Sequence, residues 1–212
     1  MDGLIAETPL VLASASPRRR RILNALGLDF TVEVPDVHEA PVEGESPVGH
    51  VERLAVLKAE TVAKRRARAT IVAADTAVLL DDRLLGKPDG PSDAERMLRE
   101  MSGRWHDVLT GVAVMTCSDG LLAQGTERTR VLFRDLTGDE IGDYVAGGEP
   151  LDKAGAYGVQ ECGAALVARI EGCFYNVMGL PVVRLRQLLA ELSDRRGRNG
   201  EPGLGRHAFT HV

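Results

Sequence analysis

The sequence lacks the features of a membrane or exported protein. No apolar run in its 212 residues reaches the roughly 18 that a membrane helix needs. The chain starts MDGLIAETPL, with acids early and no basic segment, so we expect no cleaved signal peptide. Cys117, Cys162 and Cys173 are odd in number and form no CxxC pair, which predicts neither a disulfide framework nor a zinc knuckle. We therefore expect a cytoplasmic protein in a reducing compartment.

Familiar enzyme motifs are also missing. The chain contains no GxxxxGK[ST], GxGxxG, HExxH or GxSxG segment, which argues against typical kinases, dehydrogenases, zinc proteases and hydrolases. A formal net charge of −5 does not favour a general nucleic-acid-binding protein. Lysine is scarce, and only four of the 26 basic residues are lysines: Lys58, Lys64, Lys87 and Lys153. This scarcity suggests that some of them stand where a compact point charge is needed.

Apolar periodicity and helix caps predict an α/β fold with a mixed sheet flanked by helices, in a single domain over residues 1–192. Residues 193–212 lack periodicity and are predicted to form a mobile tail. Helix starts are indicated by Ser16-Pro17 and Ser46-Pro47, and by capping boxes at Ser92 to Glu95 and Thr137 to Glu140. The predicted strands cover 10–13, 30–34, 70–80, 83–86, 105–115, 121–133 and 164–170, and the helices 17–26, 47–68, 92–101, 137–147 and 180–192.

Four consecutive arginines, Arg18 to Arg21, stand at a predicted helix N-terminus, which already carries positive partial charge. Ser14 and Ser16 precede them, directly after a predicted strand. Free backbone N–H groups, two hydroxyls and several guanidinium groups could together bind a polyanion. The alternative is a solvated basic face, but the strand–Ser-x-Ser-Pro–helix context favours the anion site.

Asp75 lies in the apolar strand segment TIVAADTAVLL, where an isolated carboxylate is costly unless a metal or a cation compensates or its pKa is raised. We interpret it as a cleft residue, with a structural carboxylate as the alternative. Lys58 shares the inward face of its predicted helix with Val51 and Leu54. Its ammonium could enter a cleft beside Asp75 or extend to solvent, and helix geometry alone does not decide between the two.

Other polar residues give less specific signals. Glu39 lies in a loop and Lys87 in a turn after a strand, while residues 152–160 form a glycine-punctuated loop of the kind that lets backbone approach a ligand. His106 is predicted to be a buried strand histidine rather than a base. A polyphosphate cradle with nearby carboxylates would select Mg²⁺ or Mn²⁺ over softer ions.

Five ordered segments resemble the Maf proteins: LASASPRRRRIL, RLAVLKAE, AADTAV, LGKP and EPLDKAGAYGVQ. The segment NVMGLP at 176–181 also fits, and the resemblance covers about residues 9–190. It implies a nucleoside triphosphate pyrophosphatase with two lobes around a cleft, related in fold to the inosine triphosphate pyrophosphatases. The products would be a monophosphate and pyrophosphate, and a divalent metal would be required. The ADT and AGAYGVQ segments resemble the branch that acts on dTTP and UTP.

The resemblance also implies roles for individual residues. Asp75 would accept a proton and, with Glu39, lie near the metal, where a water is activated to attack the α-phosphorus. The triphosphate would be bound by Ser14, Ser16, Arg18, Arg19, Lys58 and Lys87. Substrate choice would depend on Arg18, Thr76 and Gln160.

Two positions depart from the family pattern. Arg21 stands where glutamate is common, which predicts that an ion pair is missing. Glu161 stands where glycine is common, directly after Gln160, which predicts a stiffer loop at the nucleobase.

Other functions are compatible with parts of this pattern. The same chemistry could act on a modified or purine nucleotide. Maf proteins are also associated with inhibition of septum formation, so the chain could be a regulatory binding protein with little turnover, although a binder needs no base such as Asp75. Nucleic-acid binding through the arginines would depend steeply on salt, and the net charge disfavours it. The sequence gives no oligomeric state; many relatives are dimers, so a homodimer is compatible with the resemblance.

Overall fold

The computed structural model of the chain describes residues 8–198. The predictions about a signal peptide in the first residues and about a tail beyond 198 lie outside the described residues.

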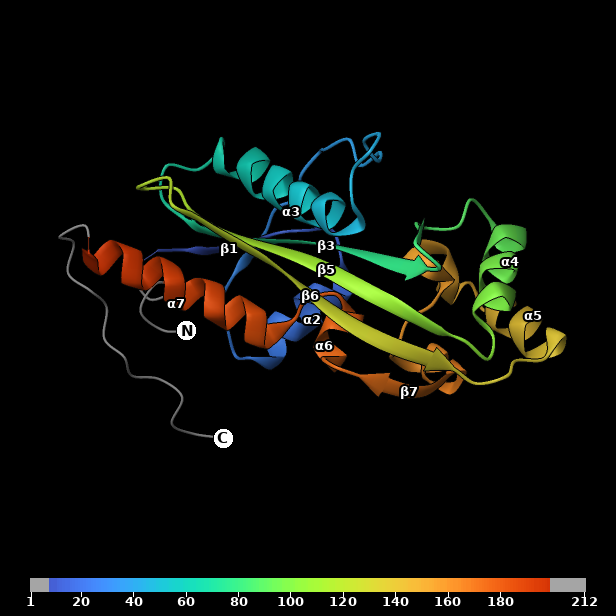
Figure 1. Cartoon of the computed structure of the whole chain (residues 1–212). Helices are drawn as coiled ribbons and strands as arrows, with labels where there is room; N and C mark the ends of the chain where they lie inside the picture. The colour runs from blue at the N-terminus through green and yellow to red at the C-terminus, as the bar shows by residue number, and fades with distance from the viewer. Residues whose placement is uncertain (1–7, 199–212) are drawn as a thin grey trace.

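A mixed sheet of seven strands runs through the centre of the molecule (Figure 1). Its order is β2-β1-β3-β5-β6-β7, and β4 pairs with β3 beside this path. β1 is parallel to β2 and β3, whereas the other pairs are antiparallel, which confirms the predicted mixed sheet. The strands are β1 (Leu10–Ala13), β2 (Thr31–Val32), β3 (Thr70–Leu80), β4 (Arg83–Leu85), β5 (Trp105–Thr116), β6 (Leu122–Phe133) and β7 (Val167–Glu171).

Helices cover both faces of the sheet and close one end of it (Figure 1). α3 lies on one face, α2, α6 and α7 lie on the other, and α4 and α5 lie at the end. Their bounds are α2 (Pro17–Ala25), α3 (Pro47–Ala63), α4 (Pro91–Met101), α5 (Gly138–Ala146), α6 (Phe174–Met178) and α7 (Val182–Arg198), with 3₁₀ turns η1 (Glu149–Asp152), η2 (Ala154–Ala156) and η3 (Glu161–Leu166).

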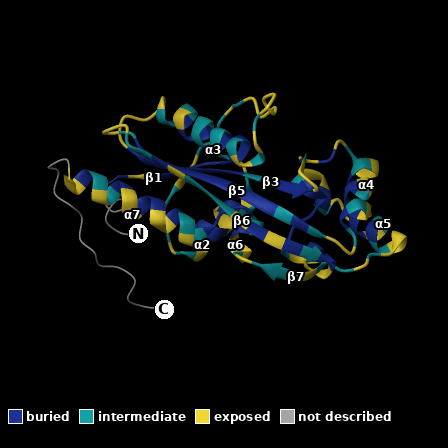
Figure 2. Cartoon of the chain, viewed as in Figure 1, coloured by how far each residue is buried: buried dark blue, intermediate teal, exposed yellow. Residues whose placement is uncertain are grey.

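Alternation along β1 divides the core between the two faces. Val11 packs with Ala55 of α3, whereas Leu12 packs with Leu185 of α7, as expected from the two-residue period of a strand. Farther along the sheet, Val78 and Leu80 of β3 belong to a separate cluster with α4 and α5. β3 and β5 are long enough to join these clusters and are buried along most of their length (Figure 2). The middle of β3 therefore lies between the two clusters around β1 and the cluster beside α4 and α5, in agreement with the predicted two lobes.

Three of the four predicted helix starts are confirmed. The Ser16 and Ser46 side chains accept bonds from the backbone N–H groups of Arg19 and Gly49, and Thr137 forms the predicted capping box. The prediction of a capping box at Ser92 is wrong. α4 begins one residue earlier, at Pro91, because proline is well suited to the first helical position, and Gly90 precedes it without a side-chain cap.

Several element boundaries differ from the sequence-based expectation. β2 is reduced to two residues, and α3 ends at Ala63 rather than at 68. Beyond this end, Arg65 and Arg66 turn away to bind Glu33. Residues 164–166, predicted as strand, belong to the 3₁₀ turn η3.

The last helix continues through Arg198 instead of ending at 192. The Arg196 side chain is buried and donates to Asp119 Oδ2 at 2.6 Å and to Ser118 Oγ at 2.7 Å. These contacts join α7 to the turn between β5 and β6. Residues 193–198 therefore form part of the domain rather than the start of a tail.

Two features concern the predicted location of the protein. Cys117, Cys162 and Cys173 are free thiols. Within residues 8–198, no helix combines the length and the apolar character needed to cross a bilayer.

Gly111 allows α3 to contact the sheet closely beside Asp75, its partner in the β3–β5 register. A Cβ atom at position 111 would lie 2.3 Å from the Val51 carbonyl oxygen of α3. Backbone atoms cannot yield as a flexible side chain can, so only glycine permits this approach.

We expect Gly111→Ala to lower the free energy of unfolding by about 1–3 kcal/mol, because α3 must move away from the sheet. Urea unfolding would measure this. Gly125→Ala on β6 is the matched control, since its added Cβ would lie 3.4 Å from Arg184 Cδ, an ordinary contact. Equal stability of the two variants would contradict the close-contact explanation.

His106 is a buried core histidine, as predicted, with 3% of its surface exposed. Its Nε2 lies 2.8 Å from the Tyr157 hydroxyl, and its ring packs edge-on against Phe133 and Tyr157. Burial lowers the pKa of His106 from 6.5 to about 4, against the smaller opposing effect of Asp107. The unfolded chain therefore binds more protons than the folded one between these two values.

The free energy of unfolding should consequently fall as the pH decreases from about 6.5 toward 4. Between pH 7 and pH 5, His106 should account for about 2 kcal/mol of this loss. The glutamine of His106→Gln cannot bind this proton. As the pH falls from 7 to 5, the free energy of unfolding of the variant should therefore rise by that amount relative to wild type. Denaturant unfolding at several pH values measures the difference, and parallel curves for the two proteins would show that His106 does not cause it.

Candidate active site

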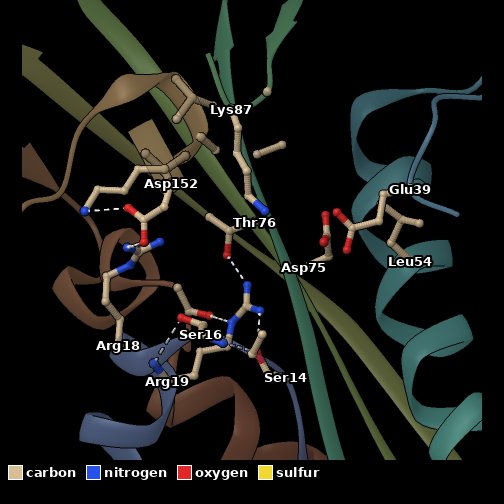
Figure 3. A pocket seen from close by; sticks show the side chains of 18 of the residues that line it. Ser14, Ser16, Arg18, Arg19, Glu39, Leu54, Asp75, Thr76, Lys87 and Asp152 are labelled. Atoms are coloured by element: carbon tan, nitrogen blue, oxygen red, sulfur yellow. Dashed lines mark hydrogen bonds and ion pairs between the residues drawn. The ribbon is translucent and has the colours of Figure 1, made fainter. Parts of the chain in front are cut away.

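A cavity of about 610 Å³ lies beside the middle of β3, between the two lobes. In Figure 3, side chains converge on it from the β1–α2 turn, from β3 and from the side of α3. Arg18 and Asp75 share this cavity, as expected if both act on one nucleotide. Every predicted site residue except Gln160 lines it: Ser14, Ser16, Arg18, Arg19, Glu39, Lys58, Asp75, Thr76 and Lys87.

The turn between β1 and α2 is fixed by its two serines. Ser14 Oγ accepts bonds from the Ser16 backbone N–H and from Arg19 Nη1, each at 3.1 Å. Ser16 Oγ caps the helix at the Arg19 N–H. The N-terminus of α2 thus opens toward the cavity, where its partial positive charge favours an anion.

Arg19 is the most firmly held cation of the site. Its Nε donates to the Gly179 carbonyl at 2.8 Å and its Nη2 to Thr76 Oγ1 at 3.0 Å, in addition to the bond to Ser14. Burial lowers its pKa, whereas the negative charges of Asp75 and Glu39 act in the opposite direction. Three of its five N–H donors are used within the protein, so two remain for a ligand.

The predicted run of four arginines does not act as one surface. Arg18 and Arg19 line the cavity, whereas Arg20 and Arg21 do not. Arg18 Nη1 lies 3.8 Å from Asp152 Oδ2, another residue that lines the cavity. The anion-binding interpretation is therefore restricted to the first two arginines.

Lys58 lies between two carboxylates. Its Nζ is 2.6 Å from Asp75 Oδ1 and 2.6 Å from Glu39 Oε1, and only 7% of the residue is exposed. Asp75 is equally buried, at 8%. The sequence left open whether Lys58 turns to solvent, and the structure directs it to Asp75.

Glu39 carries a lowered pKa. Partial burial alone would raise it, but the hydrogen bond from Lys58 and the charges of Lys58, Lys87 and Arg19 outweigh that effect. The carboxylate therefore stays ionised to lower pH than an ordinary glutamate.

The end of η1 and the residue after it supply two cavity residues that the sequence analysis did not assign to the site, Asp152 and Lys153. Lys153 is buried, and its Nζ donates to Asp152 Oδ1 at 2.7 Å and to the Glu149 carbonyl. The scarcity of lysine could have identified it, because Lys58, Lys87 and Lys153 all line the cavity.

Thr76 links the cavity to a buried polar network. Its hydroxyl lies 3.0 Å from Thr110 Oγ1, which donates to the Asn176 carbonyl at 3.2 Å. Asn176 is fully buried and donates through Nδ2 to the Val108 carbonyl and to Thr129 Oγ1. The Arg19–Thr76 contact is thus supported from behind by hydrogen bonds to the sheet.

Gln160 does not line the cavity, although Gly158, two residues earlier, does. The Gln160 Oε1 atom is buried without a hydrogen-bond partner. The neighbouring Glu161 has a positive φ of 65° and forms an ion pair with Arg21. The two departures from the family pattern therefore meet, and Arg21 has an ion-pair partner where the sequence predicted one to be missing.

Glu39 and Asp75 are the residues that could bind a metal. Among residues 8–198 no group of three or more histidine, cysteine, aspartate or glutamate side chains is arranged to hold one. Two carboxylates that line one cavity are, however, a usual protein contribution to Mg²⁺ binding, in which substrate phosphates and water complete the shell. The donor set fits a hard divalent ion that arrives with a phosphate ligand.

Comparisons with known proteins give a consistent result. A family model described as Maf-like protein matches residues 9–192. Relatives named dTTP/UTP pyrophosphatase include one from Moorella thermoacetica, 52% identical over 181 residues, covering 85% of this chain and 93% of the relative. Another, from Dictyoglomus thermophilum, is 46% identical over 184 residues, covering 86% and 95%. A third, from Symbiobacterium thermophilum, is 48% identical over 182 residues, covering 86% and 93%.

Arg19→Lys keeps the positive charge but cannot reproduce the forked contacts to Gly179 and Thr76. We expect the free energy of unfolding to fall by about 2–3 kcal/mol, because the Gly179 carbonyl loses a buried charged donor and the Thr76 hydroxyl loses one of its two contacts. Urea unfolding measures this change, with Arg20→Lys as the control on the exposed side of α2. A loss no larger than that of the control would contradict the anchoring role of Arg19.

Proposed function

The chain belongs to the Maf family, and we propose that it is a nucleoside triphosphate pyrophosphatase that hydrolyses dTTP and UTP to the monophosphate and pyrophosphate. The observation that carries this proposal is the single cavity shared by Arg18, Lys87 and Asp75. In this cavity, cations can bind a chain of phosphates, and a carboxylate can accept a proton from a water molecule. The names of the relatives support dTTP and UTP as substrates.

The cations of the cavity are the groups we assign to the triphosphate. Arg18 enters from α2 and Lys87 from the segment after β4, and Arg19 offers its two unused N–H donors. Ser14 and Ser16 contribute mainly by shaping the helix end. As the bond from the α-phosphorus to its bridging oxygen breaks, negative charge builds up on the departing pyrophosphate, and these fixed cations stabilise it.

Asp75 is the residue we assign to the attacking water. Lys58 binds its Oδ1, which orients the carboxylate and leaves Oδ2 for the water. We assign the water proton to Oδ2 as the water oxygen attacks the α-phosphorus. The new oxygen–phosphorus bond replaces the bond to pyrophosphate, which leaves with the bonding electrons.

We further propose that Glu39 and Asp75 hold a divalent metal together with phosphate oxygens, with Mg²⁺ and Mn²⁺ as the candidates. A metal bound there would lower the pKa of the attacking water and neutralise phosphate charge. The lowered pKa of Glu39 keeps this ligand deprotonated over the neutral and mildly acidic range.

Thr76 and Gln160 remain proposals for substrate choice. The Thr76 hydroxyl faces the cavity but is already bonded to Arg19 and Thr110, so its contribution would act largely through Arg19. Gln160 would need a local movement to reach a nucleobase. Its unpartnered Oε1 is compatible with such a movement, because no hydrogen bond of that atom would be broken.

We propose the cytoplasm as the location, where nucleoside triphosphates are available and free thiols such as Cys117 stay reduced. A homodimer remains a prediction. We do not propose nucleic acid as a ligand, because Arg19 is buried and Arg18 and Arg21 have acidic partners.

Asp75→Asn tests the assignment directly. The amide keeps the shape of the side chain but cannot accept the proton, so we expect kcat for pyrophosphate release from dTTP to fall about 10²- to 10⁴-fold. Asp107→Asn is the matched control on the neighbouring strand, where Asp107 pairs with Arg128 outside the cavity. Near wild-type turnover by a folded Asp75→Asn protein would refute the role.

The same assay, run with a panel of nucleotides and with Mg²⁺ and Mn²⁺, separates the other functions. A strong preference for purine or modified nucleotides would overturn the choice of dTTP and UTP. No pyrophosphate release with either metal would favour a regulatory binding protein instead.

A further inference from the structure

An ion pair joins two walls of the cavity from outside. Arg21, on α2, contacts Glu161 Oε1, at the start of η3. α2 carries Arg18 and Arg19 at the cavity, and the segment before η3 carries Asp152 and Lys153 there. The pair therefore connects the helix proposed to hold the phosphates with the loop that carries Asp152 and Lys153 to the cavity.

Arg18 makes a second, different connection between the same elements. Arg18 and Arg21 are three residues apart and lie on one side of α2, and Arg18 reaches Asp152 at 3.8 Å. Arg18 lines the cavity, so phosphate oxygens would compete with Asp152 for its guanidinium. Arg21 does not line the cavity, so phosphate oxygens would not compete with Glu161 for its guanidinium.

Glu161 is held in an unusual backbone conformation. Its φ of 65° lies in the left-handed region, which glycine adopts readily and glutamate does not. The contact of its carboxylate to Arg21 favours this placement of residue 161. The conformation of residue 161 in turn fixes the direction of the chain directly after Gln160.

We propose that Arg21 and Glu161 form a positioning pair, which holds the 158–163 loop at a set distance from the phosphate-binding end of α2 and thereby determines which nucleobase fits. This inference rests on the proposed function, since the distance matters only if a nucleotide extends from α2 to this loop. Both partners are positioning residues, because neither lines the cavity.

Charge exchange tests the pair. Arg21→Glu and Glu161→Arg each bring like charges together, and each should raise KM for dTTP about three- to tenfold while kcat changes less than about twofold, as for a solvent-exposed interaction. The double variant R21E/E161R restores opposite charges and should return KM to within about twofold of wild type. The ratio of kcat/KM for dTTP to that for dGTP should fall in the single variants and recover in the double one.

Arg20→Glu is the matched control, because it makes the same charge change one residue away, outside the cavity. Repulsion of the anionic substrate alone would give Arg20→Glu and Arg21→Glu the same KM, and it would make KM fall rather than rise in Glu161→Arg. Either result would overturn the proposal.

Hydrogen exchange in the free protein gives a readout that does not depend on turnover. Backbone amides of residues 158–163 should exchange faster in Arg21→Glu than in wild type or Arg20→Glu, and the double variant should restore protection. Unchanged exchange would overturn the pair as a loop anchor. If wild type released no pyrophosphate from any nucleotide, the proposed function would fail, while the exchange data would still decide whether the pair holds the loop.

Discussion

The site depends on one ammonium group placed between two carboxylates. Asp75 lies in the middle of a central strand, where an unpaired charge would be strongly unfavourable. Lys58 Nζ compensates that charge at 2.6 Å and binds Glu39 at the same distance. α3 can present Lys58 there because the missing side chain of Gly111 lets the helix backbone contact the sheet beside Asp75. The chemistry of the cavity and the packing of the fold are therefore set by the same contact between α3 and β5.

Much of this arrangement follows from the sequence, since its causes are local. Ser-Pro pairs start α2 and α3, and the apolar stripe that contains Val51 and Leu54 already placed Lys58 on the buried face. Asp75 could be identified because a carboxylate within an apolar strand is costly unless another group compensates its charge. Each of these signals lies within one helix or one strand, where spacing alone decides which residues share a face.

The features that could not be predicted involve contacts between distant segments. The end of α7 is stabilised by hydrogen bonds from Arg196 to the β5–β6 turn. Residues 193–198 have no periodicity that would predict this contact. The position of Gln160 is another example, since a glycine-rich loop with three 3₁₀ turns has many possible paths. Arg21 and Glu161 were each noticed as unusual, but their separation of 140 residues concealed that they pair.

The arginine-rich helix end also shows how a cationic site is stabilised without its ligand. Four positive charges at a helix N-terminus repel one another and the helix dipole, yet Arg18, Arg19 and Arg21 each have acceptors within the protein. Arg19 is fixed by a carbonyl and two hydroxyls, whereas Arg18 has a contact of 3.8 Å to an exposed carboxylate. An incoming phosphate chain therefore needs to displace one weak contact, and it meets a guanidinium that is already oriented. Such preorganisation reduces the conformational entropy lost on binding, so the internal bonds of the cationic residues assist binding of the anion.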